Sequence, residues 1–217
     1  ILVLSVINTA LPFSLFAYAS LESSSNMLSI LNGTTAIMAV VISTIWLKIR
    51  LNFFQIMGVF IGLFGIVVLA NPDNVYISMK ATIFCLSAAF CYALSANYIQ
   101  KFAYKTNTIV LIGWSLVIAS VLLLPITFFN LPSQLPSKNV IFSILWLGVI
   151  STGVAFLGYV RLIEKVGAVK TATVAYFIPV FGVIWGYVFL GEPITLQILI
   201  GMILILIGIV FTNKRYD

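Results

Sequence analysis

The amino-acid sequence predicts an all-α membrane protein with eight transmembrane helices. Hydrophobic residues make up 62% of the chain and charged residues only 7%, too few to cover the surface of a water-soluble fold. The mean hydropathy is +1.20. The few charges separate eight uncharged runs, each at least 20 residues long, which is the length that a helix needs to cross a bilayer.

The uncharged runs define the expected helices in chain order. They are 1–21, 23–47, 51–72, 81–100, 106–137, 139–160, 171–191 and 193–213. The fifth run is longer than one crossing requires. Its tail, from Asn130 to Ser137, contains two prolines and several polar residues, so we expect a loop there.

The positive charges predict how these helices are oriented. If the loop at 48–50 is cytoplasmic, nine Lys and Arg residues fall on the cytoplasmic side and only Lys80 and Lys138 on the other. Such a bias follows the positive-inside rule. We therefore expect a multi-pass protein of the plasma (inner) membrane, with a cytoplasmic C-terminus and the lipid bilayer as its partner. The scattered charges form no basic face, so nucleic acid is not an expected partner.

The chain also resembles itself at an offset of 143 residues. The matched positions include Gly58 with Gly201, Gly65-Ile-Val67 with Gly208-Ile-Val210, and Ala36 with Pro179. Equivalent loops differ in charge, because Lys48 and Arg50 correspond to a loop around Glu192 that has no positive residue. Opposite charge bias in equivalent loops predicts repeats of opposite orientation, a pattern common in secondary transporters.

The repeat divides the chain into three parts. Residues 1–71 are expected to be the last three helices of a first repeat, 80–213 a complete five-helix second repeat, and 214–217 a cytoplasmic tail. Shifting the helix that starts at residue 81 back by 143 residues places its counterpart near position −62. We therefore expect two further helices, roughly sixty residues, before Ile1, and a complete fold of ten helices in two inverted five-helix repeats.

Several motifs add a family resemblance that covers the whole chain. In the second half they are Glu164-Lys-Val-Gly-Ala168, Ala175-Tyr-Phe-Ile-Pro-Val180 and Leu190-Gly-Glu-Pro193, and in the first half Leu31-Asn-Gly-Thr-Thr35 and Trp46-Leu-Lys-Ile-Arg-Leu51. These stretches resemble EamA-type members of the drug/metabolite transporter superfamily. The resemblance implies a ten-helix fold with a central substrate cavity, and efflux as the direction of transport. Ala36 and Ile49 depart from it, since the family usually has Pro and Glu there.

Uncharged polar side chains are the candidate cavity residues, because no Asp, Glu, Lys, Arg or His lies deep within an expected span. Asn8 and Asn32 either line a pathway or bond to a neighbouring helix. Thr35 shares the face of Asn32, but its hydroxyl can equally bond its own helix backbone. The substrate-cavity candidates are Asn8, Asn32, Thr35, Tyr92, Trp114, Ser151, Tyr159, Tyr176 and Pro179.

Some candidates have two interpretations. Trp114 lies mid-span and is either a stacking wall for a solute or a packing residue. Pro179 kinks its helix and frees a backbone carbonyl, which either faces the cavity or only shapes the helix. Glu192 is either an outer gate or coupling carboxylate, or a cap of the short outer loop with Pro193 opening the last helix. Faces such as Gly58-x-x-x-Gly62 pack either within the fold or between two copies, which leaves a homodimer open.

These features predict a secondary transporter of small organic metabolites, such as amino acids or related amphipathic compounds, that works by alternating access, and the family resemblance implies that it is an exporter. The alternative is a non-transporting membrane scaffold or a degenerate subunit. An enzyme is not expected, because the chain has no His and no clustered acidic residues. For the same reason no metal or cofactor is expected.

Overall fold

The computed structural model describes residues 1–46, 48, 50–69, 78–103, 107–129, 131, 134–156, 158 and 174–212. In these residues every regular element is helical, and each of the eight uncharged runs holds one apolar helix, which confirms the all-α membrane fold class. The helices and π-helical turns are α1 (Leu2–Leu4), η1 (Ser5–Ala10), α2 (Leu11–Ala19), α3 (Ser25–Gly33), α4 (Thr35–Trp46), α5 (Phe53–Leu69), α6 (Met79–Tyr98), η2 (Ile99–Ala103), α7 (Thr108–Phe129), α8 (Lys138–Leu145), η3 (Trp146–Val154), α11 (Val174–Leu190) and α12 (Leu196–Thr212).

Several of these elements join into longer helical segments. Among the described residues, four segments are long and apolar enough to cross a membrane: Leu2–Ala19, Ser25–Trp46, Met79–Phe102 and Ile109–Phe129. The other four apolar helices have 10–17 residues and correspond to the third, sixth, seventh and eighth runs.

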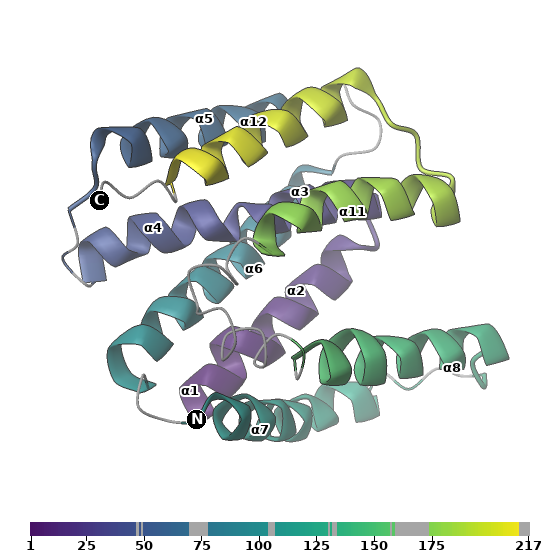
Figure 1. Ribbon diagram of the computed structural model, residues 1–217. Helices are drawn as coiled ribbons and strands as arrows, with labels where there is room; N and C mark the ends of the chain where they lie inside the picture. The colour runs from purple at the N-terminus through teal and green to yellow at the C-terminus, as the bar shows by residue number, and fades with distance from the viewer. Residues whose placement is uncertain are drawn as a thin grey trace.

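The helices lie in layers (Figure 1). α5 and α12 form an antiparallel pair on one side, α3, α4 and α11 lie beneath it, and α2 and α6 cross below them. α3 is central, because Met27, Ile30 and Leu31 are fully buried in the core. In a bilayer such side chains are stabilised by van der Waals packing against neighbouring helices rather than by removal from water.

Glycines allow α5 and α12 to touch along their backbones. A Cβ on Gly65 would lie 3.1 Å from the carbonyl oxygen of Gly201, and a Cβ on Gly58 would lie 2.7 Å from that of Gly208. The pair is tied at both ends, since Gln55 Nε2 donates to the carbonyl of Thr212 at 3.2 Å and Gln197 Nε2 donates to that of Val68 at 2.6 Å. Each glutamine lies near the start of one helix and satisfies a carbonyl near the end of the other.

Charged and aromatic residues mark the two ends of the bundle. At the end that we call the Lys101 end, the Lys101 ammonium lies 5.4 Å from the ring centroid of Trp46. At the opposite end, the Glu192 end, Lys80 pairs with Glu22 at 2.7 Å. Lys80 and Lys101 lie near opposite ends of the α6–η2 helix, roughly 30 Å apart, which matches the thickness of a bilayer core.

Helix α8 and the π-helical turn that follows it are the most exposed part of the described chain. Every side chain from Lys138 to Ile150 is exposed, and most of them are apolar. Apolar exposure of this kind fits a membrane, where lipid tails rather than water surround a helix.

Candidate functional site

The contact between α3 and α11, which we call the seam, brings the two halves of the chain together. The helices are antiparallel, and three pairs of positions meet along them: Asn26 with Gly186, Ser29 with Gly182, and Gly33 with Pro179. In each pair a glycine gives the other helix room, as small residues do in close-packed membrane helices. The seam therefore runs from the Glu192 end to the middle of the bundle.

The Ser25–Trp46 segment breaks where the seam ends. α3 stops at Gly33, α4 starts at Thr35, and the Thr34 between them is buried with its hydroxyl donating to the Leu31 carbonyl at 2.6 Å. Opposite the break, α11 carries Pro179, which has no N–H to offer the preceding turn. Thr34 itself keeps helical torsions (φ −65°, ψ −14°) and α11 runs on through Pro179, so both segments stay helical across this level and change only locally there.

Glu192 binds the beginning of α3. Its Oε1 accepts from the Ser25 backbone N–H at 2.7 Å, and its Oε2 accepts from that of Asn26 at 2.9 Å. The next free N–H, that of Met27, donates to the hydroxyl of Ser24 at 3.4 Å. Since a helix N-terminus carries partial positive charge, a carboxylate is a favourable cap, and each hydrogen bond to a charged group contributes about 1.5–3 kcal/mol.

The turn after α11 aims this carboxylate. Gly191 takes the left-handed conformation with φ 64°, which only glycine adopts without strain. The backbone then folds back so that the Glu192 N–H donates to the Gly186 carbonyl at 3.1 Å. The Leu190-Gly-Glu-Pro193 stretch thus ends one helix and caps another.

Asn26 is a polar residue inside this contact. Its side chain is 0% exposed, and neither Oδ1 nor Nδ2 has a hydrogen-bond partner among the described residues. A Cβ on Gly186 would overlap Asn26 Oδ1 and lie 2.7 Å from Glu192 Oε2. A buried amide without partners costs about 1–3 kcal/mol, comparable to the contribution of one of the two Glu192 bonds. The Asn26 amide therefore destabilises the α3–α11 contact by about as much as one Glu192 bond stabilises it.

Three of the predicted cavity residues lie at the helix break. Thr35 donates to Asn32 Oδ1 at 3.4 Å, a long distance for a hydroxyl donor. Asn32 and Thr35 flank the Gly33–Thr34 break, and Pro179 packs against Gly33 with 2.9 Å between its Cγ and the Cβ position of the glycine. Asn32, Thr35 and Pro179 are thus brought to one level of the bundle.

Other predicted residues take part in packing between helices. Asn8, in η1, accepts at Oδ1 from the Ser95 hydroxyl of α6 at 2.9 Å. Tyr92 stacks on Phe16 of α2 with ring centroids 6.2 Å apart. Both residues join the first long helix to α6, and Asn8 does so from the π-helical turn η1, a kind of turn often found at functional sites.

The remaining candidates lie away from the break or outside the description. The Trp114 side chain is 57% exposed and points away from the core, and Ser151 is exposed in η3. Tyr159 lies outside the described residues, as does the side chain of Tyr176.

The interpretation of Glu192 as a cap of its own loop was wrong, because the residue caps a different element. The carboxylate caps α3, which lies 166 residues away in sequence. Nor does Pro193 open the last helix, because α12 begins at Leu196 and the Thr195 hydroxyl accepts from the Ile198 N–H at 3.2 Å. Thr195 is therefore the N-cap of α12.

Sequence reasoning missed the α11 glycines and Asn26. Gly182-x-x-x-Gly186 is a small-residue motif that predicts a close helix contact, and it was available in the sequence. Asn26 follows three serines and reads as part of a polar loop, so its burial had no local signal.

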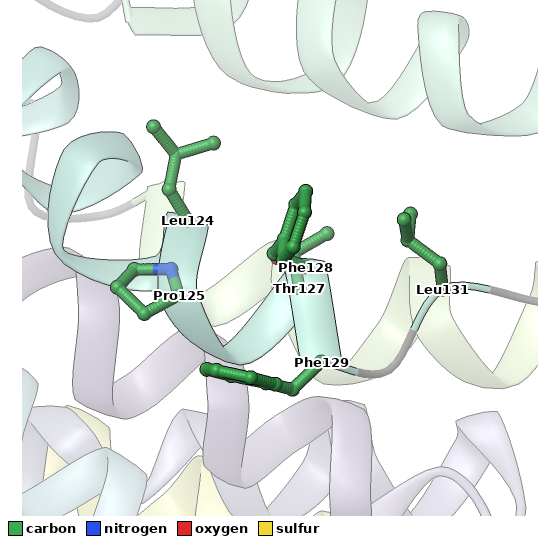
Figure 2. Close-up of a pocket in the computed structure, with 6 residues that line it drawn as sticks. All are labelled: Leu124, Pro125, Thr127, Phe128, Phe129 and Leu131. Carbon is green, nitrogen blue, oxygen red and sulfur yellow. The ribbon is translucent and has the colours of Figure 1, made fainter.

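A hollow lies at the end of α7 (Figure 2). It measures about 400 Å³ and is lined by Leu124, Pro125, Thr127, Phe128, Phe129 and Leu131. Five of the six belong to the end of α7, and Leu131 lies just after that helix. Binding sites are usually enclosed by several elements with convergent polar groups, so this hollow does not resemble one.

Charged residues are confined to the helix ends in the described chain. The charged residues within its helices are Lys80, Lys101 and Lys138, each within three residues of an end. Among the described residues, the middle of the bundle therefore offers amide, hydroxyl and aromatic groups but no counter-charge for a multiply charged solute.

Comparisons with known proteins agree with this arrangement. The EamA-like transporter family matches residues 1–71 and 79–214. The chain is 29% identical over 194 residues to an uncharacterized transporter of Archaeoglobus fulgidus, covering 88% of this chain and 69% of that protein. It is also 29% identical to the uncharacterized transporter YoaV of Bacillus subtilis, covering 87% of this chain and 66% of that protein.

The matched region thus spans about two thirds of these relatives' own length. A solved crystal structure shares the fold, with a TM-score of 0.65 at 19% identity over 96% of this chain and 73% of its own. Because the family matches nearly the whole length, the chain belongs to the EamA-like transporter family.

Proposed function

We propose that this chain works in a secondary transporter that exports small organic metabolites, such as amino acids or related amphipathic compounds, by alternating access. Its two repeats, 1–71 and 80–213, would be inverted with respect to each other and rock around a midplane site. Membership of a transporter family supports the transport role and argues against an enzyme.

The α5–α12 pair carries the proposal. Under the sequence offset of 143, Gly58 corresponds to Gly201 and Gly65 to Gly208. In the structure Gly58 meets Gly208 and Gly65 meets Gly201, so exchanging the repeats turns one contact into the other. The same offset relates the two glutamine bonds. It carries the Gln55–Thr212 bond onto positions 198 and 69, one residue away from the Gln197–Val68 bond that the structure shows. A two-fold relationship between antiparallel repeats produces such exchange, and it is the architecture of alternating-access transporters.

The substrate class follows from the groups at the helix break. Asn32 and Thr35 carry amide and hydroxyl groups that would hydrogen-bond an uncharged or zwitterionic solute, and Pro179, which has no N–H, leaves a carbonyl of the preceding turn of α11 without its helical donor. Described spans without buried charge do not favour a multiply charged solute. The positive-inside rule supports an orientation with the Lys101 end and the C-terminus in the cytoplasm and the Glu192 end outside, and a plasma (inner) membrane is part of the proposal.

The test is counterflow transport in proteoliposomes that contain the complete protein. Radiolabelled amino acids are offered one at a time, and we expect saturable uptake of at least one. Asn32→Leu should reduce this uptake at least tenfold, while Ser120→Ala should not change it, because the exposed Ser120 bonds only its own helix at the Leu116 carbonyl. A folded protein that neither binds nor moves any offered solute would favour the scaffold alternative.

A further inference from the structure

The bond between Glu192 and α3 can be broken without unfolding a helix. Glu192 lies just after α11, and the two N–H groups that it binds open α3. Because the acceptor is a side chain and the donors are the free groups of a helix N-terminus, a rotation of the side chain is enough to release them. The bond is therefore suited to forming and breaking during a transport cycle.

The seam beside this bond is built on two glycines. α11 offers Gly182 and Gly186 to α3 over the part of the seam nearest Glu192, so no α11 side chain at these two positions interlocks with α3. α11 packs along α3 but has no comparable contact with α4 beyond the break. Separation at the Glu192 end would withdraw the small Asn26 and Ser29 side chains from the spaces at Gly186 and Gly182, and would uncover Val183, which is buried in one core cluster with α3. The Gly33–Pro179 contact lies at the far end of the seam.

Asn26 acts against closure. When α3 and α11 are together, its amide is fully buried without a partner among the described residues. When they separate, water can reach the amide and satisfy it. The closed seam is thus held by the Glu192 carboxylate and opposed by the Asn26 amide, a balance that suits a two-state element.

We propose that Glu192 is the latch of an outer gate formed by α3 and α11, with Asn26 as the group that favours opening. The inference rests on the proposed function, since it assigns the outer gate of the same transporter. Under the repeat relationship Glu192 corresponds to Ile49, an aliphatic residue, so the sequence supplies this carboxylate at one end only. The latch is therefore expected at the Glu192 end and not at the equivalent position of the other repeat.

The experiment measures how fast a membrane-impermeant thiol reagent labels Ser29→Cys, which faces Gly182 inside the seam. The complete protein is used in vesicles that expose the Glu192 end. Cys85 and Cys91 are buried on α6, and the protein without the added cysteine gives their background. Glu192→Ala should raise the labelling rate at least tenfold, and Glu192→Gln, which keeps one carbonyl oxygen, should raise it less.

Two further variants separate a latch from a merely structural role. Asn26→Leu, similar in shape but apolar, should lower the labelling rate at least threefold, because it removes the group that favours opening. Glu22→Ala removes a second carboxylate from the same end, one that pairs with Lys80, and should leave labelling unchanged. An unchanged labelling rate in Glu192→Ala overturns the inference. A labelling rate that rises in Glu192→Ala, Asn26→Leu and Glu22→Ala alike overturns it as well.

Labelling reports the gate whether or not a substrate is known, which keeps this test apart from the transport test. If Glu192→Ala and Asn26→Leu shift labelling in opposite directions but no solute is moved, the latch stands and the transport proposal fails. If transport is observed but Glu192→Ala does not change the labelling rate, the transport proposal stands and the latch fails. If Glu192→Ala does not fold, Glu192→Gln and Asn26→Leu decide in the same way.

Discussion

Gly58 and Gly208 meet backbone to backbone in the α5–α12 pair. A Cβ on Gly208 would lie 2.8 Å from the Gly58 carbonyl oxygen, closer than real Cβ contacts allow. The atom it would meet belongs to the main chain and cannot move aside as a flexible side chain could. The contact therefore requires glycine at position 208.

We expect Gly208→Ala to lower the free energy of unfolding by about 1–3 kcal/mol, the usual cost of overpacking a well-packed contact. Denaturant titration of the purified protein in detergent, followed by tryptophan fluorescence, measures this change. Gly113→Ala is the matched control, because nothing lies within 4 Å of a Cβ there. Equal losses of stability in the two variants would show that the close contact is not what matters.

The hydrogen bond between Ser95 and Asn8 should give measurable coupling between η1 and α6. Hydrogen bonds between membrane helices contribute about 0.6 kcal/mol on average, so we expect that coupling from a double-mutant cycle of Asn8→Ala and Ser95→Ala. A second cycle pairs Asn8→Ala with Ser14→Ala, whose hydroxyl bonds its own helix at the Ala10 carbonyl. That second cycle should be additive. Additive effects in both cycles would mean that the Asn8–Ser95 bond contributes nothing.

The contact between Gly33 and Pro179 should matter for transport more than for folding. A Cβ at position 33 would lie 2.9 Å from Pro179 Cγ and would push α11 away from the helix break. We expect Gly33→Ala to slow transport roughly tenfold, because displacing a binding group by a fraction of an ångström raises the barrier by about 1.4 kcal/mol. The folded fraction in size-exclusion chromatography should stay near that of the unmodified protein.

Gly148→Ala serves as the control for this prediction, since its added Cβ meets nothing within 4 Å. It should leave the transport rate unchanged. A transport rate in Gly33→Ala equal to that of the unmodified protein would remove the helix break from the substrate pathway.

The loop carboxylate of Glu22 should titrate below its ordinary range. The pKa of Glu22 is lowered from 4.5 by the hydrogen bond from Lys80 first and by that from the Ser78 hydroxyl second. A depressed pKa means that the pair stabilises the folded state above the ordinary pKa, and that this contribution is lost as pH falls through the lowered value. Both side chains are exposed to solvent, so the contribution to stability is small.

Carboxyl carbon NMR of labelled glutamate measures this pKa directly. Lys80→Met should raise the pKa of Glu22 toward 4.5, and Ser78→Ala should raise it by less. Lys138→Met, which removes a different exposed lysine, should have no effect. If Lys80→Met leaves the titration where it was, the pair seen in the structure is not maintained in solution.

The sequence by itself determined the class of the protein and the number of its apolar helices in the described chain. Charges cannot lie deep in a bilayer, so the gaps between Glu22, Lys48 and the later charges already marked the spans. The glycine register at Gly58, Gly65, Gly201 and Gly208 also indicated an internal repeat, because close helix packing leaves a readable pattern of small residues.

Only the tertiary structure decided which polar groups meet. Nothing near Glu192 in sequence shows that its carboxylate reaches Ser25 and Asn26, because that bond depends on how α11 lies against α3. Likewise, the burial of Asn26 depends on Gly186, 160 positions further along the sequence. Hydrophobicity along a chain follows the depth of each residue in the membrane, whereas the partner of a polar side chain depends on the neighbouring helix, and helix neighbours are set by packing in three dimensions.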